Sequence, residues 1–152
     1  MKDIFVEDYE QDLFTTAFKR YFGEISTNTR NWSMLFSQMN AEKENTKTIM
    51  RLDGEAVVGF VMFCEITLKC IFFYERIGYV RELWVDARYR SMGNGRDLLE
   101  KAEMCFAENN IKKSVLSIVC GKEKFYEKCG YERSLSLISE DGRIYTKEIA
   151  VF

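Results

Sequence analysis

The spacing of apolar residues changes several times along the chain, between the period of a helix and that of a strand. Intervals of three and four residues predict amphipathic helices, over residues 8–22 with an end at Gly23, from Trp32 to Met39, over 94–108 and over 122–128. Runs rich in β-branched and aromatic residues predict strands, over residues 2–6, 46–52, 55–68, 71–85, 114–119, 131–138 and 143–151. The polar run at residues 24–31 predicts a loop.

The order of these elements predicts an α/β (α+β) fold. Asp53-Gly54, between two strands, favours a tight hairpin. The strand, helix and strand over residues 71–119 predict a right-handed crossover, so the strand ending at Val85 is expected to lie parallel to the strand 114–119. Gly78 is expected to mark a bulge or a bend. Together the elements predict a mixed, mostly antiparallel central sheet of six to seven strands with helices on both faces.

Length and composition bound the size and the environment of the protein. A chain of 152 residues, 47% of them hydrophobic, predicts a single domain over residues 1–152. The net charge of −2 gives no overall attraction to nucleic acid or to an anionic membrane, and charges interrupt every long apolar run. We therefore expect no nucleic-acid partner and no membrane association.

Cysteine and histidine usage narrows the chemistry. The five cysteines form no Cys-x-x-Cys pair and the chain has no histidine, so no metal site is expected. We interpret the cysteines as reduced thiols and predict a cytoplasmic protein. Without histidine, any proton transfer falls to Glu, Asp, Tyr, Lys or Cys.

A glycine-containing segment lies between the strand that ends at Val85 and the helix over residues 94–108. Gly93 and Gly95 leave backbone N–H groups bare at the start of this helix, which predicts a phosphate site. A Walker A loop is excluded because Arg96-Asp97 stands where Lys-Ser/Thr is required. A dinucleotide fingerprint is excluded by Leu98 and by the position of the loop in mid-chain.

Two motifs in this order resemble the GNAT family of N-acetyltransferases. The first is Arg-x-x-Gly-x-Gly at residues 90–95, preceded by the strand end Leu83-Trp84-Val85-Asp86 and followed by Leu98-Leu99. The second is Lys-Phe-Tyr-Glu-Lys-Cys-Gly-Tyr at residues 124–131, which looks like the Phe-Tyr-Glu-Lys-x-Gly-Phe/Tyr segment of the family. The motifs cover roughly the second half of the chain, and the earlier helices and hairpin follow the family's usual order.

The resemblance implies that acetyl-coenzyme A (acetyl-CoA) is the cosubstrate, bound without a metal. The loop is then expected to bind the pyrophosphate, and the strand ending at Val85 to splay in a V from the strand 114–119 and expose backbone groups to the pantetheine arm. The implied cofactor-binding residues are Leu83, Trp84, Val85, Arg90, Ser91, Met92, Gly93, Asn94, Gly95 and Arg96. Arg88 and the side chain of Arg96 are equally well interpreted as solvated surface residues.

The resemblance also implies the chemistry: an acetyl-CoA-dependent N-acetyltransferase that moves an acetyl group directly to a primary amine in a ternary complex. Tyr126 matches the tyrosine that donates a proton to the leaving sulfur, with ordinary aromatic packing as its alternative role. Glu82 matches a position that often supplies the base, with a solvated or ion-paired glutamate as the alternative. Glu75 and Glu65 are weaker candidates for the base.

Departures from the family pattern leave other functions open. Ser91, Asn94 and Ala87 stand where glycine, an aliphatic residue and proline are common. The connection at residues 119–121 lacks the asparagine that many members place before the tyrosine helix. A catalytically inactive acyl-CoA-binding or regulatory module is one alternative, and a purely structural domain is another. We expect a small-molecule or peptide amine as the acceptor, and both a monomer and a homodimer remain open.

Overall fold

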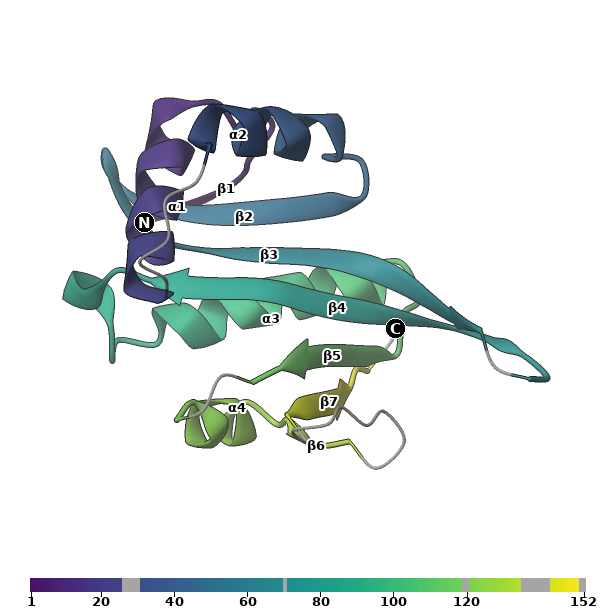
Figure 1. The fold of residues 1–152 in the computed structure, drawn as a ribbon. Coiled ribbons are helices and arrows are strands. Elements are labelled where there is room, and N and C mark those ends of the chain that lie inside the picture. Colours follow the sequence, from purple (N-terminus) through teal and green to yellow (C-terminus); the bar gives the residue numbers. More distant parts are fainter. Residues whose placement is uncertain (26–30, 70, 119–120, 135–142, 151–152) are drawn as a thin grey trace. The chain divides into compact units, whose positions relative to one another are not determined.

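The computed structural model describes residues 1–25, 31–69, 71–118, 121–134 and 143–150 (Figure 1). Its helices are α1 (Asp12–Ile25), α2 (Trp32–Ala41), the short 3-10 helix η1 (Ala87–Tyr89), α3 (Asn94–Glu108) and α4 (Glu123–Lys128). Its strands are β1 (Lys2–Phe5), β2 (Thr46–Asp53), β3 (Ala56–Lys69), β4 (Tyr74–Val85), β5 (Lys113–Ser117), β6 (Glu132–Arg133) and β7 (Ile144–Glu148). None of these helices is long and apolar enough to cross a membrane.

The strands form one seven-stranded mixed sheet in the order β1-β2-β3-β4-β5-β7-β6, which confirms the predicted fold class. β1 pairs antiparallel with β2, and β7 pairs antiparallel with both β5 and β6. β4 pairs parallel with β5, with Gly78 opposite Ser114, as the strand, helix and strand order predicted. The predicted hairpin turn at Asp53-Gly54 is also present, and Gly54 adopts a φ of 62°.

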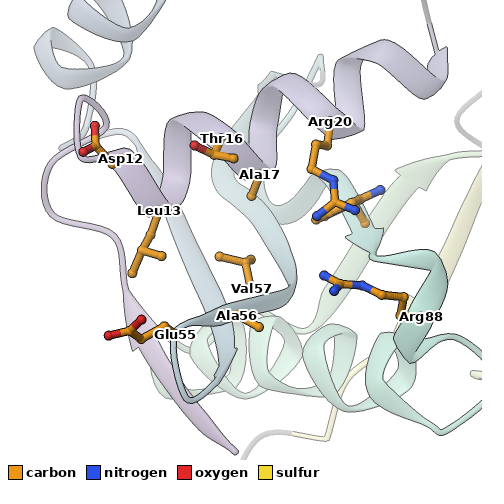
Figure 2. A pocket seen from close by; sticks show the side chains of 10 residues that line it. Asp12, Leu13, Thr16, Ala17, Arg20, Glu55, Ala56, Val57 and Arg88 are labelled. Atoms are coloured by element: carbon orange, nitrogen blue, oxygen red, sulfur yellow. The ribbon is translucent and has the colours of Figure 1, made fainter.

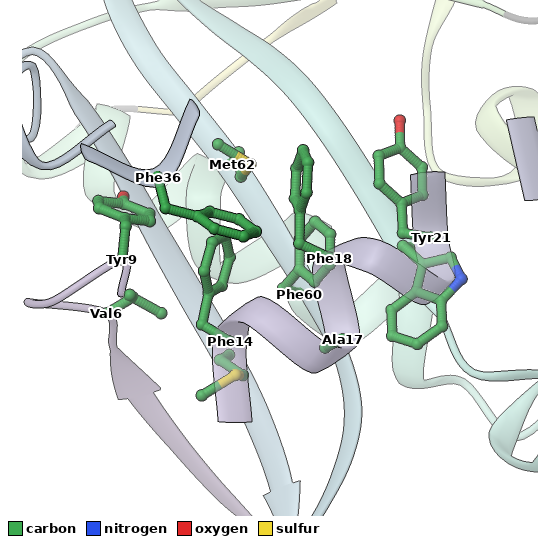
Figure 3. Packing of buried hydrophobic residues seen from close by; sticks show 11 residues of the cluster. Val6, Tyr9, Phe14, Ala17, Phe18, Tyr21, Phe36, Phe60 and Met62 are labelled. Atoms are coloured by element: carbon green, nitrogen blue, oxygen red, sulfur yellow. The ribbon is translucent and has the colours of Figure 1, made fainter. Parts of the chain in front are cut away.

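The chain divides into two compact units, Met1–Met62 with Glu82–Leu99, and Phe63–Arg81 with Glu100–Phe152. In the first unit, α1 and α2 cover one face of the strands. Phe14 and Phe18 of α1 pack against Phe36 of α2 and Phe60 of β3 (Figure 3), with ring centroids 5.8–6.1 Å apart. The apolar residues at intervals of three and four in α1 therefore form the core that the sequence predicted.

Side chains along β2 alternate between two faces, as in any strand. Met50 belongs to the cluster under α1 and α2, whereas Arg51 extends to the first turn of α3. Helices thus cover both faces of the sheet within the first unit.

The second unit is built around the later part of α3. The ring of Phe106 packs edge-on against Phe63 and lies so close to Gly78 that a Cβ there would come within 2.4 Å of it. The absence of a side chain at Gly78 therefore leaves room for the Phe106 ring. The sequence predicted a bulge or a bend at Gly78, which pairs in register with Ser114 of β5.

Several element boundaries differ from the predicted ones, and the structure shows the reason for three of them. α1 begins at Asp12 and not at residue 8, because the Asp8 carboxylate accepts from the N–H of Glu10 and holds a turn before the helix. The helix also continues past Gly23 to Ile25, and the contacts of Glu24 described below account for this last turn. β4 begins at Tyr74, since Ile71 and Phe72 are each 92% exposed and have no core to pack against. The loop predicted at residues 24–31 and the turn of the closing hairpin lie mostly outside the described residues.

Candidate active site

Side-chain hydrogen bonds connect the C-terminal end of β4 to the C-terminal half of α1. The hydroxyl of Tyr21 donates to the carboxylate of Glu82. Trp84 Nε1 donates to Glu24 Oε2 at 3.0 Å. Glu82 and Trp84, two residues apart, share one face of the strand, and Tyr21 and Glu24, three residues apart, share one face of the helix. Each residue of the strand pair therefore meets one residue of the helix pair. The result is a fixed orientation for Glu82, the predicted base.

Asp86 directly follows β4, lies two residues after Trp84 and is 1% exposed. Its carboxylate accepts from Nε and Nη2 of Arg88 at 3.1 and 3.3 Å, and from Nη2 of Arg20 at 2.8 Å. The hydrogen bond from the Arg88 side chain is the main cause that lowers the pKa of Asp86, and the backbone N–H of Arg88 and the charge of Arg20 act in the same direction. Asp86 therefore stays ionised and caps η1 at the end of the strand.

The backbone at the end of β4 is crowded on its β3 side. A Cβ at Gly59 would lie 2.3 Å from the carbonyl oxygen of Trp84, so only glycine fits there. The pairing described between β4 and β5 ends at Val80 opposite Leu116, and β4 continues from there to Val85. Leu83 and Val85, whose backbone groups were predicted to bind the pantetheine arm, are half-buried.

The loop between η1 and α3 carries the amides predicted to bind the pyrophosphate. Residues 90–93 are exposed, and Ser91 and Gly93 have φ values of 62° and 86°. Across the described parts of the chain, the backbone N–H groups of Ser91, Met92, Gly93, Asn94 and Gly95 donate no hydrogen bond of good geometry to another protein group. These N–H groups lie at the start of α3, where the helix dipole favours an anion.

This loop fits the pyrophosphate of acetyl-CoA. Apart from Gly93 and its chain neighbours, no atom of the described residues lies within 4 Å of the position that a Cβ on Gly93 would take, so the loop is open at that point. Several unsatisfied amides at a helix start are the donors that a diphosphate requires. The side chain of Asn94 is buried and donates to the carbonyl of Tyr89 at 3.0 Å, so Asn94 offers the site only its backbone N–H.

Arg90 is bonded to the groups beside it. Its Nε donates to the carbonyl of Val85 at 2.8 Å and its Nη2 donates to Glu24 Oε2 at 2.9 Å. Two groups predicted to contact the cofactor, Arg90 and the Val85 carbonyl, are thus bonded to each other. Arg96 is exposed near the start of α3.

A pocket of about 260 Å³ is lined by residues of α1, of the β2–β3 turn and of η1, together with Trp84 of β4 (Figure 2). Its walls are mainly apolar and include Leu13, Ala17 and Val57, while Arg20 and Arg88 extend into it from α1 and η1. Leu13 is 36% exposed because it lines this pocket instead of the core. The sequence did not decide between a cofactor-binding and a solvated role for Arg88, and in the structure its guanidinium forms an ion pair with Asp86.

The other predicted catalytic residue, Tyr126, lies on α4 in the second unit and is half-buried. Its ring packs edge-on against Phe125 and Tyr131, with centroids 5.0 and 6.1 Å away. Glu65 bonds to Arg76 and Asn109, and Glu75 pairs with Lys113 at 3.3 Å, so both weaker candidates for the base have partners of their own. Residues 119–120 of the connection before α4 lie outside the described residues.

A family model described as an acetyltransferase (GNAT) domain matches residues 44–133, more than half of the chain. The chain belongs to this GNAT acetyltransferase family. No curated protein shows a significant sequence match to it.

Solved structures share the fold of this GNAT domain. A predicted acetyltransferase with acetyl-CoA from Clostridium acetobutylicum is 15% identical, with a TM-score of 0.77 over 91% of this chain and 94% of that chain. The NatC complex bound to Gag peptide and CoA gives 14% identity and a TM-score of 0.68 over 99% and 100%. A mutant AtaT toxin bound to the C-terminus of the antitoxin AtaR and acetyl-CoA gives 13% and 0.71 over 97% and 92%.

Sequence reasoning missed the residues of this GNAT domain that hold the candidate site from α1. Tyr21 and Glu24 were placed at the end of a helix and in a loop, yet they bond to Glu82, Trp84 and Arg90. The available signal was the spacing of Tyr21 and Glu24, one helical turn apart, beside the two-residue spacing of Glu82 and Trp84.

Proposed function

We propose that this protein is an acetyl-CoA-dependent N-acetyltransferase that transfers the acetyl group directly to a primary amine in a ternary complex. The observation that carries the proposal is the set of backbone amides from Ser91 to Gly95, which donate no hydrogen bond within the described parts of the chain, in a loop whose residues 91–93 are exposed. The first N–H groups of any helix have no intrahelical partner, and here the loop adds those of Ser91 and Met92, so that one diphosphate can satisfy several of them together.

The loop residues and their neighbours supply the cofactor site in this proposal. The N–H groups of residues 91–95 bind the pyrophosphate, and Arg90 and Arg96 add positive charge. Backbone groups of Leu83, Trp84 and Val85 receive the pantetheine arm. Arg90 must give up its bond to Glu24 or to Val85 to reach a phosphate, and its side chain is 45% exposed to solvent.

When bound, acetyl-CoA supplies a thioester whose acetyl group can pass to an amine. The acceptor ammonium has to lose a proton before its nitrogen attacks, and Glu82 is the carboxylate assigned to that step. Its orientation by the Tyr21 hydroxyl supports this role, because a base must be held within reach of the proton it takes. Tyr126 is assigned the protonation of the departing sulfur.

The acceptor in this proposal is a cationic amine, either a small molecule or a peptide. The carboxylate of Glu82 and the net charge of −2 favour a cation over an anion. We also infer that the protein works in the cytoplasm, in keeping with reduced cysteines, as a monomer or a homodimer.

Calorimetric titration of acetyl-CoA into the full chain tests the cofactor site. Gly93 and Gly54 both adopt positive φ and both have open space around them, so Gly54→Ala is a matched control for Gly93→Ala. Each variant loses about 1 kcal/mol of stability through the left-handed backbone. We expect Gly93→Ala to weaken acetyl-CoA binding about tenfold and Gly54→Ala to leave it within about twofold. Equal affinities for the two variants, or no binding by the wild-type chain, would overturn the proposal.

A further inference from the structure

We propose that Arg51 is a positioning residue for the pyrophosphate loop and that it acts through Asn94, which joins the two ends of the loop. This inference rests on the proposed function, because it concerns how the same loop binds CoA. Neither residue suggested this role in the sequence.

The guanidinium of Arg51 is fixed at its strand end by Asp3. The two residues lie opposite each other in the β1–β2 register. Arg51 Nε and Nη2 donate to the two carboxylate oxygens of Asp3 at 2.7 and 3.0 Å, a two-pronged geometry that only arginine provides. Arg51 is 8% exposed, and the hydrogen bond that it donates to Asp3 is the main cause that raises its pKa, so its charge persists at all working pH values.

The remaining nitrogen of this guanidinium reaches the first turn of α3. Arg51 Nη1 donates to Asn94 Oδ1 at 3.0 Å and to Asp97 Oδ2 at 3.1 Å. Asn94 is 5% exposed, and its Nδ2 donates to the carbonyl of Tyr89 at 3.0 Å. Tyr89 ends η1 just before the loop and Asn94 begins α3 just after it, so one side chain connects both ends. The contacts from Asp3 to Tyr89 therefore tie the loop to the sheet.

The same contact offsets an unfavourable charge. Asp97 is the acidic residue in the first turn of α3, beside the amides that bind the anion in the proposed function. A carboxylate at that place repels a phosphate, and water screens this repulsion only in part, because the Asp97 side chain is 55% exposed. By pairing with Asp97, Arg51 reduces this repulsion while it holds Asn94.

Three variants distinguish the effect of the Arg51–Asn94–Tyr89 hydrogen bonds from the effect of the negative charge on Asp97. Asn94→Ala removes the contacts to both Arg51 and Tyr89 but leaves the pair of Arg51 with Asp3 intact. Asp97→Asn is the matched control, since it keeps an acceptor oxygen for Arg51 and the Asn94 connection but loses the negative charge. Arg51→Lys keeps a positive charge and replaces the fork with a single ammonium, which cannot hold Asp3 and Asn94 together.

The readout compares CoA with pantetheine, which lacks the pyrophosphate, in titrations followed by NMR on the full chain. We expect Asn94→Ala and Arg51→Lys to bind CoA about tenfold more weakly and pantetheine within about twofold of wild type. Asp97→Asn is expected to bind CoA as well as wild type or more tightly. Thermal melting confirms that each variant is folded, and if Arg51→Lys is unfolded then Asn94→Ala decides the test.

The outcomes are distinguishable. Selective loss of CoA affinity in Asn94→Ala, with Asp97→Asn unimpaired, supports the proposal. Equal losses of affinity for CoA and pantetheine would show that Asn94 has a merely structural role, and this would overturn the proposal. Unchanged CoA affinity in Asn94→Ala would also overturn it. If the wild-type chain binds pantetheine and CoA equally, or neither, the proposed function itself fails and this inference fails with it.

Discussion

Glu24 accepts a hydrogen bond from the indole of Trp84 at 3.0 Å and connects the last turn of α1 to the end of β4. The same carboxylate oxygen accepts from Arg90 at 2.9 Å. Glu24 thus holds Arg90 away from the role that the proposed function gives it. Because the ion pair is exposed, with 45% and 43% of the two side chains accessible, it is weak enough to exchange for a phosphate.

Removing this competitor is expected to strengthen cofactor binding. Glu24→Gln keeps an acceptor for Trp84 but loses the charge that pairs with Arg90, so we predict two- to fivefold tighter CoA binding by calorimetry, about 0.5–1 kcal/mol. The effect should vanish in an Arg90→Gln background. Tighter binding in that background as well would mean that Glu24 acts on another group.

The assignment of Glu82 as the base predicts a loss of rate without a loss of cofactor affinity. In a free-thiol assay with an amine that the wild-type protein acetylates, Glu82→Gln should lower kcat about a hundredfold or more. Tyr21→Phe, which removes the hydroxyl that orients Glu82, should lower kcat about tenfold. Glu75→Gln is the matched control and should act like wild type, since Glu75 pairs with Lys113. A normal kcat in Glu82→Gln would remove Glu82 from the mechanism.

If Tyr126 is the proton donor, removing its hydroxyl should lower kcat without lowering the stability of the protein. Tyr126→Phe keeps the ring contacts with Phe125 and Tyr131, so its melting temperature should stay close to that of wild type. Its kcat should fall about ten- to a thousandfold because the proton donor is lost. Tyr74→Phe, at a site that is 72% exposed, serves as the control. If no amine supports thiol release by the wild-type protein although acetyl-CoA binds, an inactive acyl-CoA-binding module becomes the better account.

Ser91 adopts a φ of 62° at a position where related loops commonly have glycine. A serine in this left-handed region is strained, and glycine relieves the strain while it loosens the unfolded chain. We predict that Ser91→Gly raises the free energy of unfolding by about 0.5–1 kcal/mol in urea titrations and leaves CoA affinity within about twofold. A lower stability would show that the serine side chain stabilises the loop.

The lowered pKa of Asp86 predicts a pH-dependent contribution to stability. A carboxylate with a depressed pKa in the folded state contributes fully above its ordinary value of 3.8, and the contribution is lost as pH falls through the folded-state pKa. Asp86→Asn should therefore be less stable than wild type by about 1 kcal/mol at pH 7. The gap should close below about pH 4. A gap that stays constant down to pH 2.5 would mean that the ionised carboxylate contributes nothing.

Local sequence signals were sufficient for most of the fold. The apolar spacing of α3 predicted Asn94–Glu108 with both ends correct, and the crossover rule predicted that β4 and β5 are parallel. The start of α1 was wrong because the Asp8 carboxylate holds a turn before Asp12, a side-chain bond that apolar spacing does not register. The sequence could not show that Gly78 makes room for the ring of Phe106, because this ring comes from a distant part of the chain.

The loop of the candidate site was predictable from glycines and a helix start, since both are local. The contacts that hold it were not. Arg51 lies more than forty residues before Asn94 in the sequence, and Tyr21 about sixty before Glu82, so only the folded chain brings them together. A lone arginine in a strand gives no sequence signal for a buried pair with Asp3. The roles of Glu82, Tyr126 and the loop amides in binding and catalysis stay predictions.

The central claim is that the backbone amides from Ser91 to Gly95 bind the pyrophosphate of acetyl-CoA. An acetyl-CoA titration of the ¹⁵N-labelled full chain, followed residue by residue in amide spectra, tests this most directly. We predict that these five resonances undergo the largest downfield shifts and that Gly93→Ala, which binds about tenfold more weakly, shows smaller shifts at the same subsaturating ligand concentration. Binding that leaves all five resonances unmoved, or an absence of binding at millimolar acetyl-CoA, would contradict it.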